Sequence, residues 1–436
     1  MTNGEIYSIP IFGLDDEISS RKNQVNRKEA MHYCSPSGGG WGVVKVACIV
    51  PETEILFAIP IGCGRHGSIA SFYDGTADRL SFFIIEEVDI VMGSHIEKIK
   101  EAAKELYYER RPKGMILCTT CMDDLLGSDY DGITAELEKE LGIPVGRGKM
   151  NPILSDTPKD PSLMIQKTIH DFLEKVDKDE KKLNVIGSFE NIDRDSELHE
   201  LFACNGLDPI SHVSDFETFG EYKAEMERAC GNIVISPLGS VAGKYLEKKI
   251  GQKYMPVYSS YRKDEIDKSY EILGSYLSRN FETSEYSKLL QEKILEARIK
   301  LRGLSVALGT NGVSRSFDLA RFLVELGMDV RYVLARSVIE VDKKNVDWLR
   351  VHSPHIKVIP NLEPSIALHG ESLDKVDICI GLDVAKIFEC KYLVELENSM
   401  NHFGYRSSIK LIDKLISKEA FDGDIVKRIY DANLVT

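Results

Sequence analysis

The sequence has no surplus of positive charge. Its 436 residues include 55 Lys and Arg against 69 Asp and Glu, which gives a formal net charge of −14. General nucleic-acid binders and proteins held on anionic lipid carry basic surfaces, so the charge balance argues against both classes. We therefore expect neither nucleic acid nor a membrane among the partners of this chain.

Three further features are missing. No apolar run approaches the roughly 18–20 residues of a membrane-spanning helix. The first residues, MTNGEIYSIP, do not show the basic stretch and apolar run of a signal peptide. No GxxxxGK[ST] motif occurs, so the sequence predicts no P-loop for ATP. The expected compartment is the cytoplasm.

The number of cysteines in the sequence is not even. The sequence has nine, and an odd number without an export signal does not predict a disulfide framework. In a reducing compartment such cysteines fill the core, act as nucleophiles or bind metal. The residues around each cysteine must therefore distinguish between these roles.

A strand–helix–strand pattern is clearest in GLSVALGTNGVSRSFDLARFLVELGMDVRYVLA. Leu304–Leu308 is a short apolar run that predicts a buried parallel strand, and Val330–Leu334 predicts the next strand. Between them, one helix face is formed by Leu319, Phe322, Leu323 and Leu326. Such a βαβ unit implies a parallel sheet.

Similar units begin at Leu183, Asn232 and Val376, and TEILFAIPIGC and KGMILCTTC read as buried strands. We therefore expect an α/β fold of three Rossmann-like domains, with parallel sheets flanked by helices. Two charged stretches suggest the domain limits: the run Leu173–Asn184 and the long helical region Arg262–Arg302.

The predicted domains follow from these limits. The first, residues 1–180, carries the candidate cysteines discussed next. The second, residues 181–300, ends with the long connecting helix, and the third covers residues 301–436.

Three cysteines lie in loops that follow predicted strands. They are Cys34 in MHYCSPSGGGWG, Cys63 in IPIGCGRHGS and Cys121 in ILCTTCMDDLLGSD. The carboxyl ends of strands are where α/β sheets place ligands. The spacings are too wide for compact zinc or ferredoxin motifs, but soft thiolates among glycine backbone suit an iron–sulfur cluster. The alternative is three unrelated cysteines, one of them a core residue.

The other six cysteines favour structural roles. Cys118 forms a CxxC pair with Cys121, but it lies within the apolar run GMILC and reads as a buried strand residue. Cys48 and Cys379 also read as residues of strand cores. The residues next to Cys204, Cys230 and Cys390 do not indicate a catalytic or metal-binding role.

A family resemblance rests on the stretch from Glu87 to Ile133, EVDIVMGSHIEKIKEAAKELYYERRPKGMILCTTCMDDLLGSDYDGI, together with the glycine-rich loops around the earlier cysteines. This stretch resembles the nitrogenase component 1 superfamily, and TTCMDDLLGSD is most similar to its β-type subunit. The family includes the dinitrogenase subunits, cofactor-assembly scaffolds, the dark-operative protochlorophyllide and chlorophyllide reductases and the nickel-tetrapyrrole reductase of coenzyme F430 synthesis.

The resemblance implies a metal site and partners. Cys34, Cys63 and Cys121 match the three cysteines with which one family subunit holds an interface iron–sulfur cluster, 4Fe-4S or larger. The remaining ligands would come from a second copy or from a related component 1 subunit. An ATP-dependent iron protein would be the electron donor.

Two departures from the family pattern bear on the substrate. Where the dinitrogenase catalytic subunit has a cysteine that anchors its iron–molybdenum cofactor, this chain reads NIVISPLGSVAG, with Ser236. The matching late histidine is absent, and His402 is displaced. The departures leave two alternatives. Either this chain resembles the β-type subunit and its partner carries the cofactor, or the chain reduces its substrate in a cavity that holds no second metal cluster.

The resemblance implies an oxidoreductase, a subunit of a nitrogenase-like reductase whose catalytic residues and substrate stay open. A scaffold for assembly of a nitrogenase-type metal cofactor is the first alternative, and a cluster-free α/β small-molecule-binding protein is the second. Weaker candidates are a phosphate-binding loop at Gly309, Arg65 and His66 beside the second cysteine, and a possible substrate-binding group of Glu395, Glu397, Asn398, His402 and Tyr405.

Overall fold

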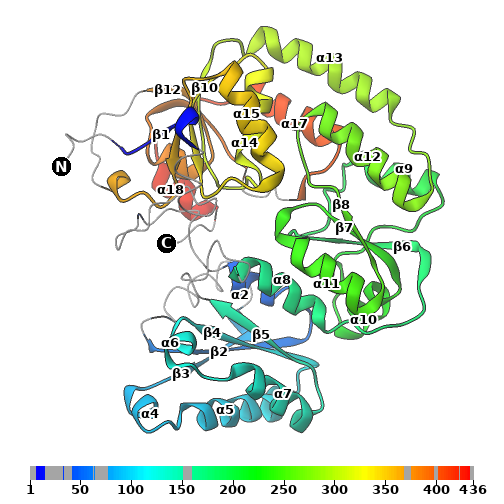
Figure 1. The fold of residues 1–436 in the computed structure, drawn as a ribbon, viewed down its shortest axis with the longest axis vertical. Helices are drawn as coiled ribbons and strands as arrows, with labels where there is room; N and C mark the ends of the chain where they lie inside the picture. Colours follow the sequence, from blue (N-terminus) through cyan, green and yellow to red (C-terminus); the bar gives the residue numbers. More distant parts are fainter. Residues whose placement is uncertain are drawn as a thin grey trace.

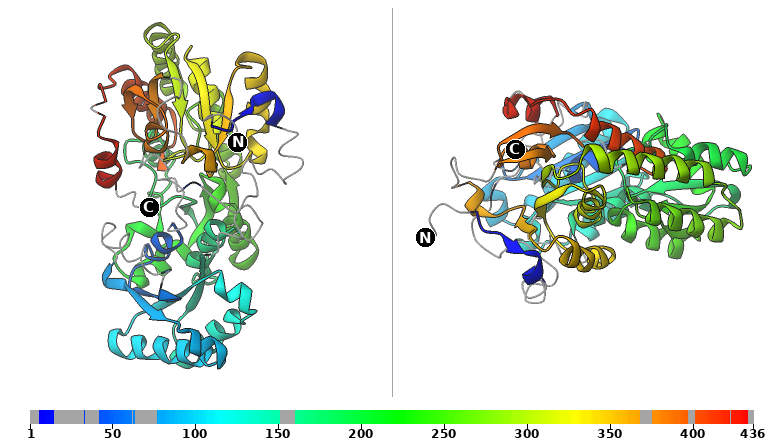
Figure 2. Two further views of the ribbon diagram at one scale, coloured as in Figure 1. Left: turned by 90° about the vertical axis from the view of Figure 1, so that its left-hand side faces the viewer. Right: turned by 90° about the horizontal axis from the view of Figure 1, so that it is seen from above.

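The structure, a computed structural model, is an α/β protein with three sheets in separate parts of the molecule (Figure 1). In the side view of Figure 2, the first sheet lies at the opposite end of the molecule from the third. The residues described are 6–14, 33, 42–61, 63, 77–150, 160–367, 375–396, 401–421 and 423–432.

The first sheet has four parallel strands in the order β3-β2-β4-β5. The strands are β2 (Thr53–Ile59), β3 (Leu80–Ile84), β4 (Gly114–Thr120) and β5 (Val145–Met150). Its helices are α2 (Gly42–Ala47), α4 (Glu87–Val91), α5 (His95–Arg110), α6 (Met122–Leu126), α7 (Tyr130–Leu141) and α8 (Pro161–Asp171).

Alternate residues of the central strand β2 pack on opposite faces of this sheet. Ile55 and Phe57 join the core beneath α2 and α8, whereas Leu56 and Ala58 join the core beneath α5 and α7. Because successive side chains of a strand point to opposite faces, a strand covered on both sides must be apolar throughout. This explains the unbroken apolar run 55–59 of β2.

The second sheet has three parallel strands in the order β6-β7-β8. They are β6 (Asp179–Ile186), β7 (Ala229–Val234) and β8 (Lys253–Pro256), and the helices of this part are α9 (Glu197–Cys204), α10 (Phe219–Glu227) and α11 (Ser240–Ile250). The first six residues of β6, 179–184, belong to the charge run expected to separate two domains, so part of that run is a strand.

The third sheet has six strands in the order β1-β11-β10-β9-β12-β13, of which only β1 is antiparallel. Its strands are β1 (Ile9–Pro10), β9 (Ser305–Leu308), β10 (Asp329–Ala335), β11 (Lys357–Pro360), β12 (Val376–Ile380) and β13 (Cys390–Val394). The helices are α14 (Ser316–Glu325), α15 (Lys343–His352), α16 (Leu382–Ala385), α17 (Tyr405–Ile416) and α18 (Ile425–Asp431). The first described strand therefore belongs to the third sheet.

The helical region before β9 differs from the expected single long helix. It consists of α12 (Lys263–Leu277) and α13 (Ser284–Lys300). Ser278 ends α12 in the left-handed conformation, with φ 51°, and the chain turns before α13 begins. No proline breaks the helix, so the sequence pattern did not reveal the turn.

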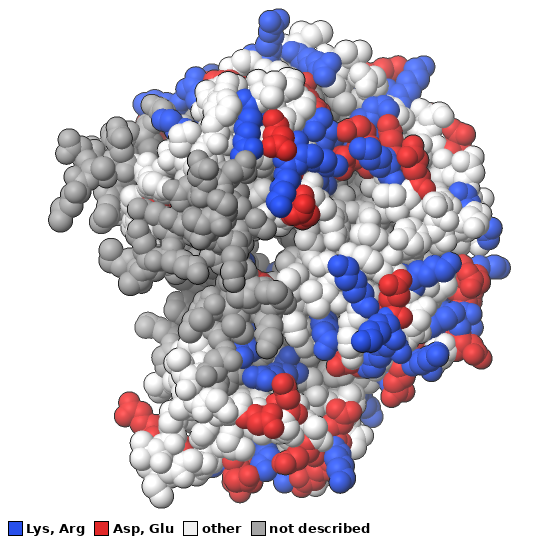
Figure 3. Space-filling model, viewed as in Figure 1, with Lys and Arg blue, Asp and Glu red and all other residues white. Residues whose placement is uncertain are grey.

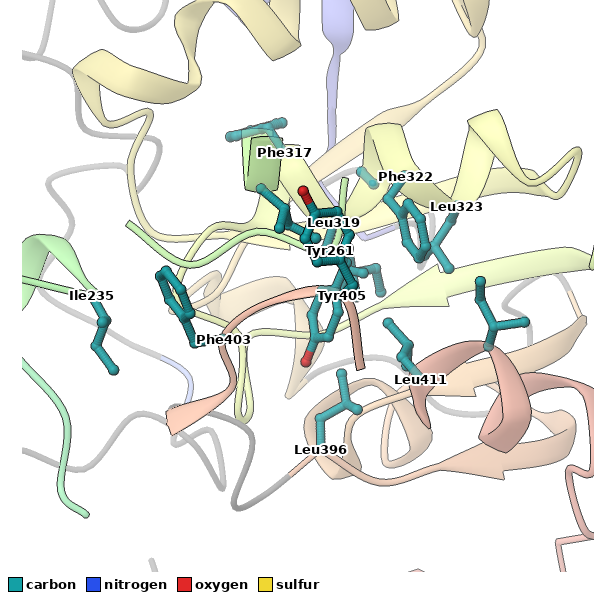
Figure 4. Close-up of a cluster of buried hydrophobic side chains, with 14 of the residues drawn as sticks. Ile235, Tyr261, Phe317, Leu319, Phe322, Leu323, Leu396, Phe403, Tyr405 and Leu411 are labelled. Carbon is teal, nitrogen blue, oxygen red and sulfur yellow. The ribbon is translucent and has the colours of Figure 1, made fainter. Parts of the chain in front are cut away.

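One buried core joins the second and third sheets. Ile235 after β7 belongs to the same cluster of apolar side chains as Phe317 of α14 and Leu411 of α17. Figure 4 shows Tyr261, Phe403 and Tyr405 between these elements. Because the aromatic rings bury large areas, this contact fixes the two sheets relative to each other.

The α/β class with parallel sheets and flanking helices is confirmed, as is the βαβ unit of β9, α14 and β10. The limits at residues 180 and 300 stay a prediction. The strand expected around Cys48 is wrong, because α2 ends at Ala47 and Cys48 lies in the turn that follows. Among the described helices, none has both the length and the hydropathy needed to cross a membrane.

Candidate functional site

Two of the three candidate cysteines lie at one edge of the first sheet. Cys121 directly follows the last residue of β4, and Cys63 comes four residues after the end of β2. These strands are parallel neighbours, so their carboxyl ends meet at the same edge. The fold therefore brings together two cysteines that are 58 residues apart in the sequence.

The Cys121 thiol affects the acidity of the Cys63 thiol. Cys63 is largely exposed, and Cys121 is half-buried. Partial desolvation raises the pKa of the Cys63 thiol, and the neighbouring Cys121 thiol raises it further. Two thiols that resist joint deprotonation lose their protons when a soft cation binds both, because the thiolate is the form that coordinates metal.

This donor set fits part of an iron–sulfur site. Soft thiolates are the usual ligands of iron–sulfur clusters, and a full set has four. Cys34 lies outside the described residues, as do Arg65 and His66. Within the part of the chain that the structure describes, no group of three potential metal ligands gathers. Cys63 and Cys121 could thus supply two of the four thiols of such a site, with the others coming from elsewhere.

Cys118 points away from this edge into the core. Its side chain packs with Ile116 beneath α8, against the backbone of Gly148. Burial strongly raises the pKa of its thiol, and nearby Cys48 raises it further. Cys118 is a core residue, as its apolar context predicts.

The remaining described cysteines lie away from this edge, and two of them, Cys379 of β12 and Cys390 of β13, are neighbours whose thiols interact. Cys379 and Cys230 are buried in strands of the third and second sheets, and Cys390 is half-buried at the start of β13. Cys204 is exposed at the end of α9. These positions agree with the structural roles favoured for them.

The sequence did not single out the apolar side chains around the cysteine pair. Ile61 is 79% exposed, Val91 83%, Met92 74% and Leu125 74%. They follow β2, β3 and β4, so all lie toward the edge that carries Cys63 and Cys121. We call Ile61, Val91, Met92 and Leu125 the apolar edge; Figure 3 shows a largely uncharged area at the lower left, where Figure 1 places α4. Clustered exposed apolar residues of this kind mark interaction surfaces.

Two members of the suggested substrate-binding group, His402 and Tyr405, are built into the core instead, whereas Glu395 is half-buried and pairs with Arg428. The ring of His402 stacks on Tyr261, with centroids 4.1 Å apart and planes 3° apart. The backbone N–H of Tyr405 donates to Glu197 Oε1 at 2.7 Å, and its hydroxyl donates to Asp267 at 2.6 Å. Glu397 and Asn398 lie outside the described residues. These contacts join α17 to α9 and α12.

The proposed phosphate loop at Gly309 already holds a carboxylate. Asp383 Oδ2 accepts hydrogen bonds from the backbone N–H of Thr310 at 2.7 Å and from its hydroxyl at 2.8 Å. A Cβ on Gly309 would lie 1.9 Å from Asp383 Oδ1. The carboxylate therefore occupies the place that a phosphate would need.

The chain is similar to known nitrogenase proteins. The nitrogenase molybdenum-iron protein alpha chain of Methanosarcina barkeri is 23% identical over 360 residues, which cover 74% of this chain and 65% of that protein. The nitrogenase iron-molybdenum cofactor biosynthesis protein NifE of Clostridium pasteurianum is 24% identical over 289 residues, covering 62% of this chain and 61% of that protein. This chain thus matches less than two thirds of the length of either relative.

A solved structure shares the fold. Nitrogenase Cp1 at pH 6.5 superposes with a TM-score of 0.67 at 18% identity, over 91% of this chain and 95% of that one. The family model described as Nitrogenase component 1 type Oxidoreductase matches residues 60–417, most of the chain and both described cysteines of the pair. The chain therefore belongs to the nitrogenase component 1 type oxidoreductase family.

Proposed function

We propose that this chain is a subunit of a nitrogenase-like reductase. It holds an iron–sulfur cluster at a subunit interface through Cys34, Cys63 and Cys121. It accepts electrons from an ATP-dependent iron protein and passes them to a substrate. The cluster supplies the electron chemistry, while the protein sets its burial and position.

The pairing of Cys63 with Cys121 beside the apolar edge carries this proposal. Three cysteines are one short of a four-thiolate set, so the site requires a donor from outside the chain. The exposed side chains of Ile61 and Leu125 next to the pair suit burial against a second protein. A partner seated there, a second copy or a related component 1 subunit, would exclude water from the cluster.

The region around Ser236 supports a role for this chain without a second, cysteine-anchored metal cofactor. Ser236 is buried, its hydroxyl donates to the carbonyl oxygen of Gly187, and the backbone N–H of Leu238 donates back to it. Because its hydroxyl makes these two hydrogen bonds, Ser236 caps a turn, and it offers no soft ligand to a metal cofactor. The acceptor of the electrons is then a cofactor on the partner or a substrate bound between the domains.

A cofactor-assembly scaffold is the second candidate. The similarity to a protein whose name states a role in iron-molybdenum cofactor biosynthesis favours it, and a scaffold shares the same cysteine arrangement. The two roles differ in the fate of what is bound, because a scaffold releases its cargo to another protein.

The metal site is tested first with single cysteine variants. Wild type, Cys63→Ala, Cys121→Ala and Cys118→Ala are reconstituted anaerobically with ferrous iron and sulfide, and protein-bound iron and visible absorption are measured. We expect Cys63→Ala and Cys121→Ala to lose the cluster and Cys118→Ala to keep it, since Cys118 faces the core. Full iron content in the first two variants would overturn the assignment.

Electron transfer is tested next. The reconstituted chain, with its partner subunit where one is required, is mixed with a reduced iron protein and MgATP. Bleaching of the cluster absorption that requires ATP supports the reductase. Transfer of the bound metal to an acceptor protein, without such bleaching, favours the scaffold.

A further inference from the structure

A hollow of about 270 Å³ lies between the helices α12, α13 and α14. One water molecule takes up about 30 Å³ of liquid, so the hollow has room for a small organic molecule. Figure 1 shows these three helices in the upper half of the molecule and the first sheet in the lower half. The hollow is therefore separate from the edge that carries Cys63 and Cys121.

The lining of the hollow carries more positive than negative charge, although the chain as a whole is acidic. Four cations and three carboxylates line it: Arg262, Lys263, Arg298 and Arg321, with Asp264, Asp267 and Glu325. The formal net charge of the whole chain is −14. A concave surface with one excess positive charge attracts an anion.

Each of the three carboxylates is already paired with one of these cations. The hydrogen-bonded pairs are Arg262 with Asp264 at 2.5 Å, Lys263 with Asp267 at 2.7 Å, and Arg321 with Glu325 at 2.8 Å. A cation that faces a carboxylate at such a distance has little net attraction left for a further anion. The excess positive charge therefore belongs to the fourth cation, Arg298.

Arg298 makes no ion pair within the part of the chain that the structure describes. Its Nε atom donates to the carbonyl oxygen of Glu325 at 2.8 Å, which holds the guanidinium group beside the end of α14 and leaves its two Nη atoms for another acceptor. Two Nη atoms match the two oxygens of a carboxylate. Gln291 lies two helical turns earlier on α13, and its side-chain amide likewise makes no hydrogen bond to a described residue.

The rest of the lining is apolar. Ile294, one turn before Arg298, contributes to it together with Phe322 and Leu326 of the facing helix region. Sites for small organic ligands combine apolar walls with a few polar groups that fix the orientation of the ligand. Here the polar groups are the donors Arg298 and Gln291.

We propose that this hollow binds a small organic monocarboxylate. The carboxylate pairs with the Nη atoms of Arg298, and the apolar body of the ligand lies against Phe322 and Leu326. One negative charge on the ligand balances the one excess positive charge of the lining. This site goes beyond the proposed function, and its occupation does not depend on the metal site.

The test measures binding of three probes to the full chain by isothermal titration at constant ionic strength. Isocaproate is a monocarboxylate with a branched apolar body, isocaproamide has the same shape without the charge, and inorganic phosphate has charge without an apolar body. The variants are Arg298→Ala, Gln291→Ala and the control Arg302→Ala. Arg302 is exposed two residues beyond the end of α13 and does not line the hollow, so its replacement makes the same change in net charge.

We expect isocaproate to bind wild type and Arg302→Ala equally, and to bind Arg298→Ala about tenfold more weakly because a charge-assisted hydrogen-bonded pair is lost. Gln291→Ala should bind it about threefold more weakly, since one neutral hydrogen bond is lost. This variant removes no hydrogen bond to a described residue, so it gives a readout even where Arg298→Ala does not fold. Isocaproamide and phosphate should bind wild type more weakly than isocaproate does.

Equal isocaproate affinity in wild type and in Arg298→Ala would overturn the inference. So would an unchanged affinity in Gln291→Ala, an amide that binds as tightly as the acid, or phosphate that binds more tightly than isocaproate. A wild-type protein that does not bind isocaproate would also overturn it. None of these results bears on iron binding by the cysteine variants.

Discussion

The buried residue His170 predicts that the free energy of unfolding falls as the pH is lowered. It lies at the end of α8, fully buried in the core shared by the first and second sheets, and neither of its ring nitrogens has a hydrogen-bond partner among the described residues. Burial and, to a smaller extent, the neighbouring His212 lower the pKa of His170 from 6.5 to about 3. The imidazole ring of His170 therefore stays neutral in the folded protein at neutral pH.

His212 is buried beside it. Burial lowers the pKa of His212 to about 4, although a hydrogen bond to the backbone of Ser188 raises it slightly. Below pH 6.5 the unfolded chain takes up protons at both histidines while the folded protein does not, so stability falls as the pH falls. The loss continues down to the folded pKa values.

The magnitude follows from these values. One pKa unit corresponds to about 1.4 kcal/mol, so lowering the pH from 6.5 to about 5 costs each histidine roughly 2 kcal/mol. Two such losses total roughly 4 kcal/mol, against the 5–15 kcal/mol that usually stabilises a folded domain. His170→Leu, of similar volume, should remove about half of this acid sensitivity.

The assay is urea unfolding of metal-free protein, followed by circular dichroism at about pH 7.5 and about pH 5. The free energy lost between these pH values should be about 2 kcal/mol smaller in His170→Leu than in wild type. His352→Leu, at an exposed position at the end of α15, is the matched control and should behave as wild type. An unchanged pH dependence in His170→Leu would refute the reasoning.

Four further substitutions test contacts between distant parts of the chain, each by urea unfolding. Glu197→Gln should cost about 2 kcal/mol, since a buried carboxylate caps the N-terminus of α17. Gly309→Ala should cost about 3 kcal/mol, because a Cβ would collide with the buried carboxylate of Asp383. Asp160→Ala should cost about 1–2 kcal/mol and Arg336→Ala less than about 1 kcal/mol, because the two side chains form an ion pair, Asp160 also caps a helix and Arg336 is partly exposed.

Local patterns in the sequence predicted the strands and helices well where their period was regular. The run Leu304–Leu308 and the spacing of Leu319, Phe322 and Leu323 predicted β9 and α14 correctly, since burial on both sheet faces or on one helix face repeats along the chain. The short segment around Cys48 misled, because a brief apolar run fits a strand and a helical turn equally well. Likewise, no local signal marked the turn at Ser278.

The sequence alone identified Cys63 and Cys121 as candidates because each follows a predicted strand, and the tertiary structure decided that they are neighbours, because β2 and β4 pair in parallel. It also decided that Tyr33 packs in the core of the third sheet and that His170 is buried beside His212. These facts depend on which strands and helices pack together over hundreds of residues. Hydrophobic period and turn chemistry act over only a few residues, so they specify the elements but not the partners that each element meets.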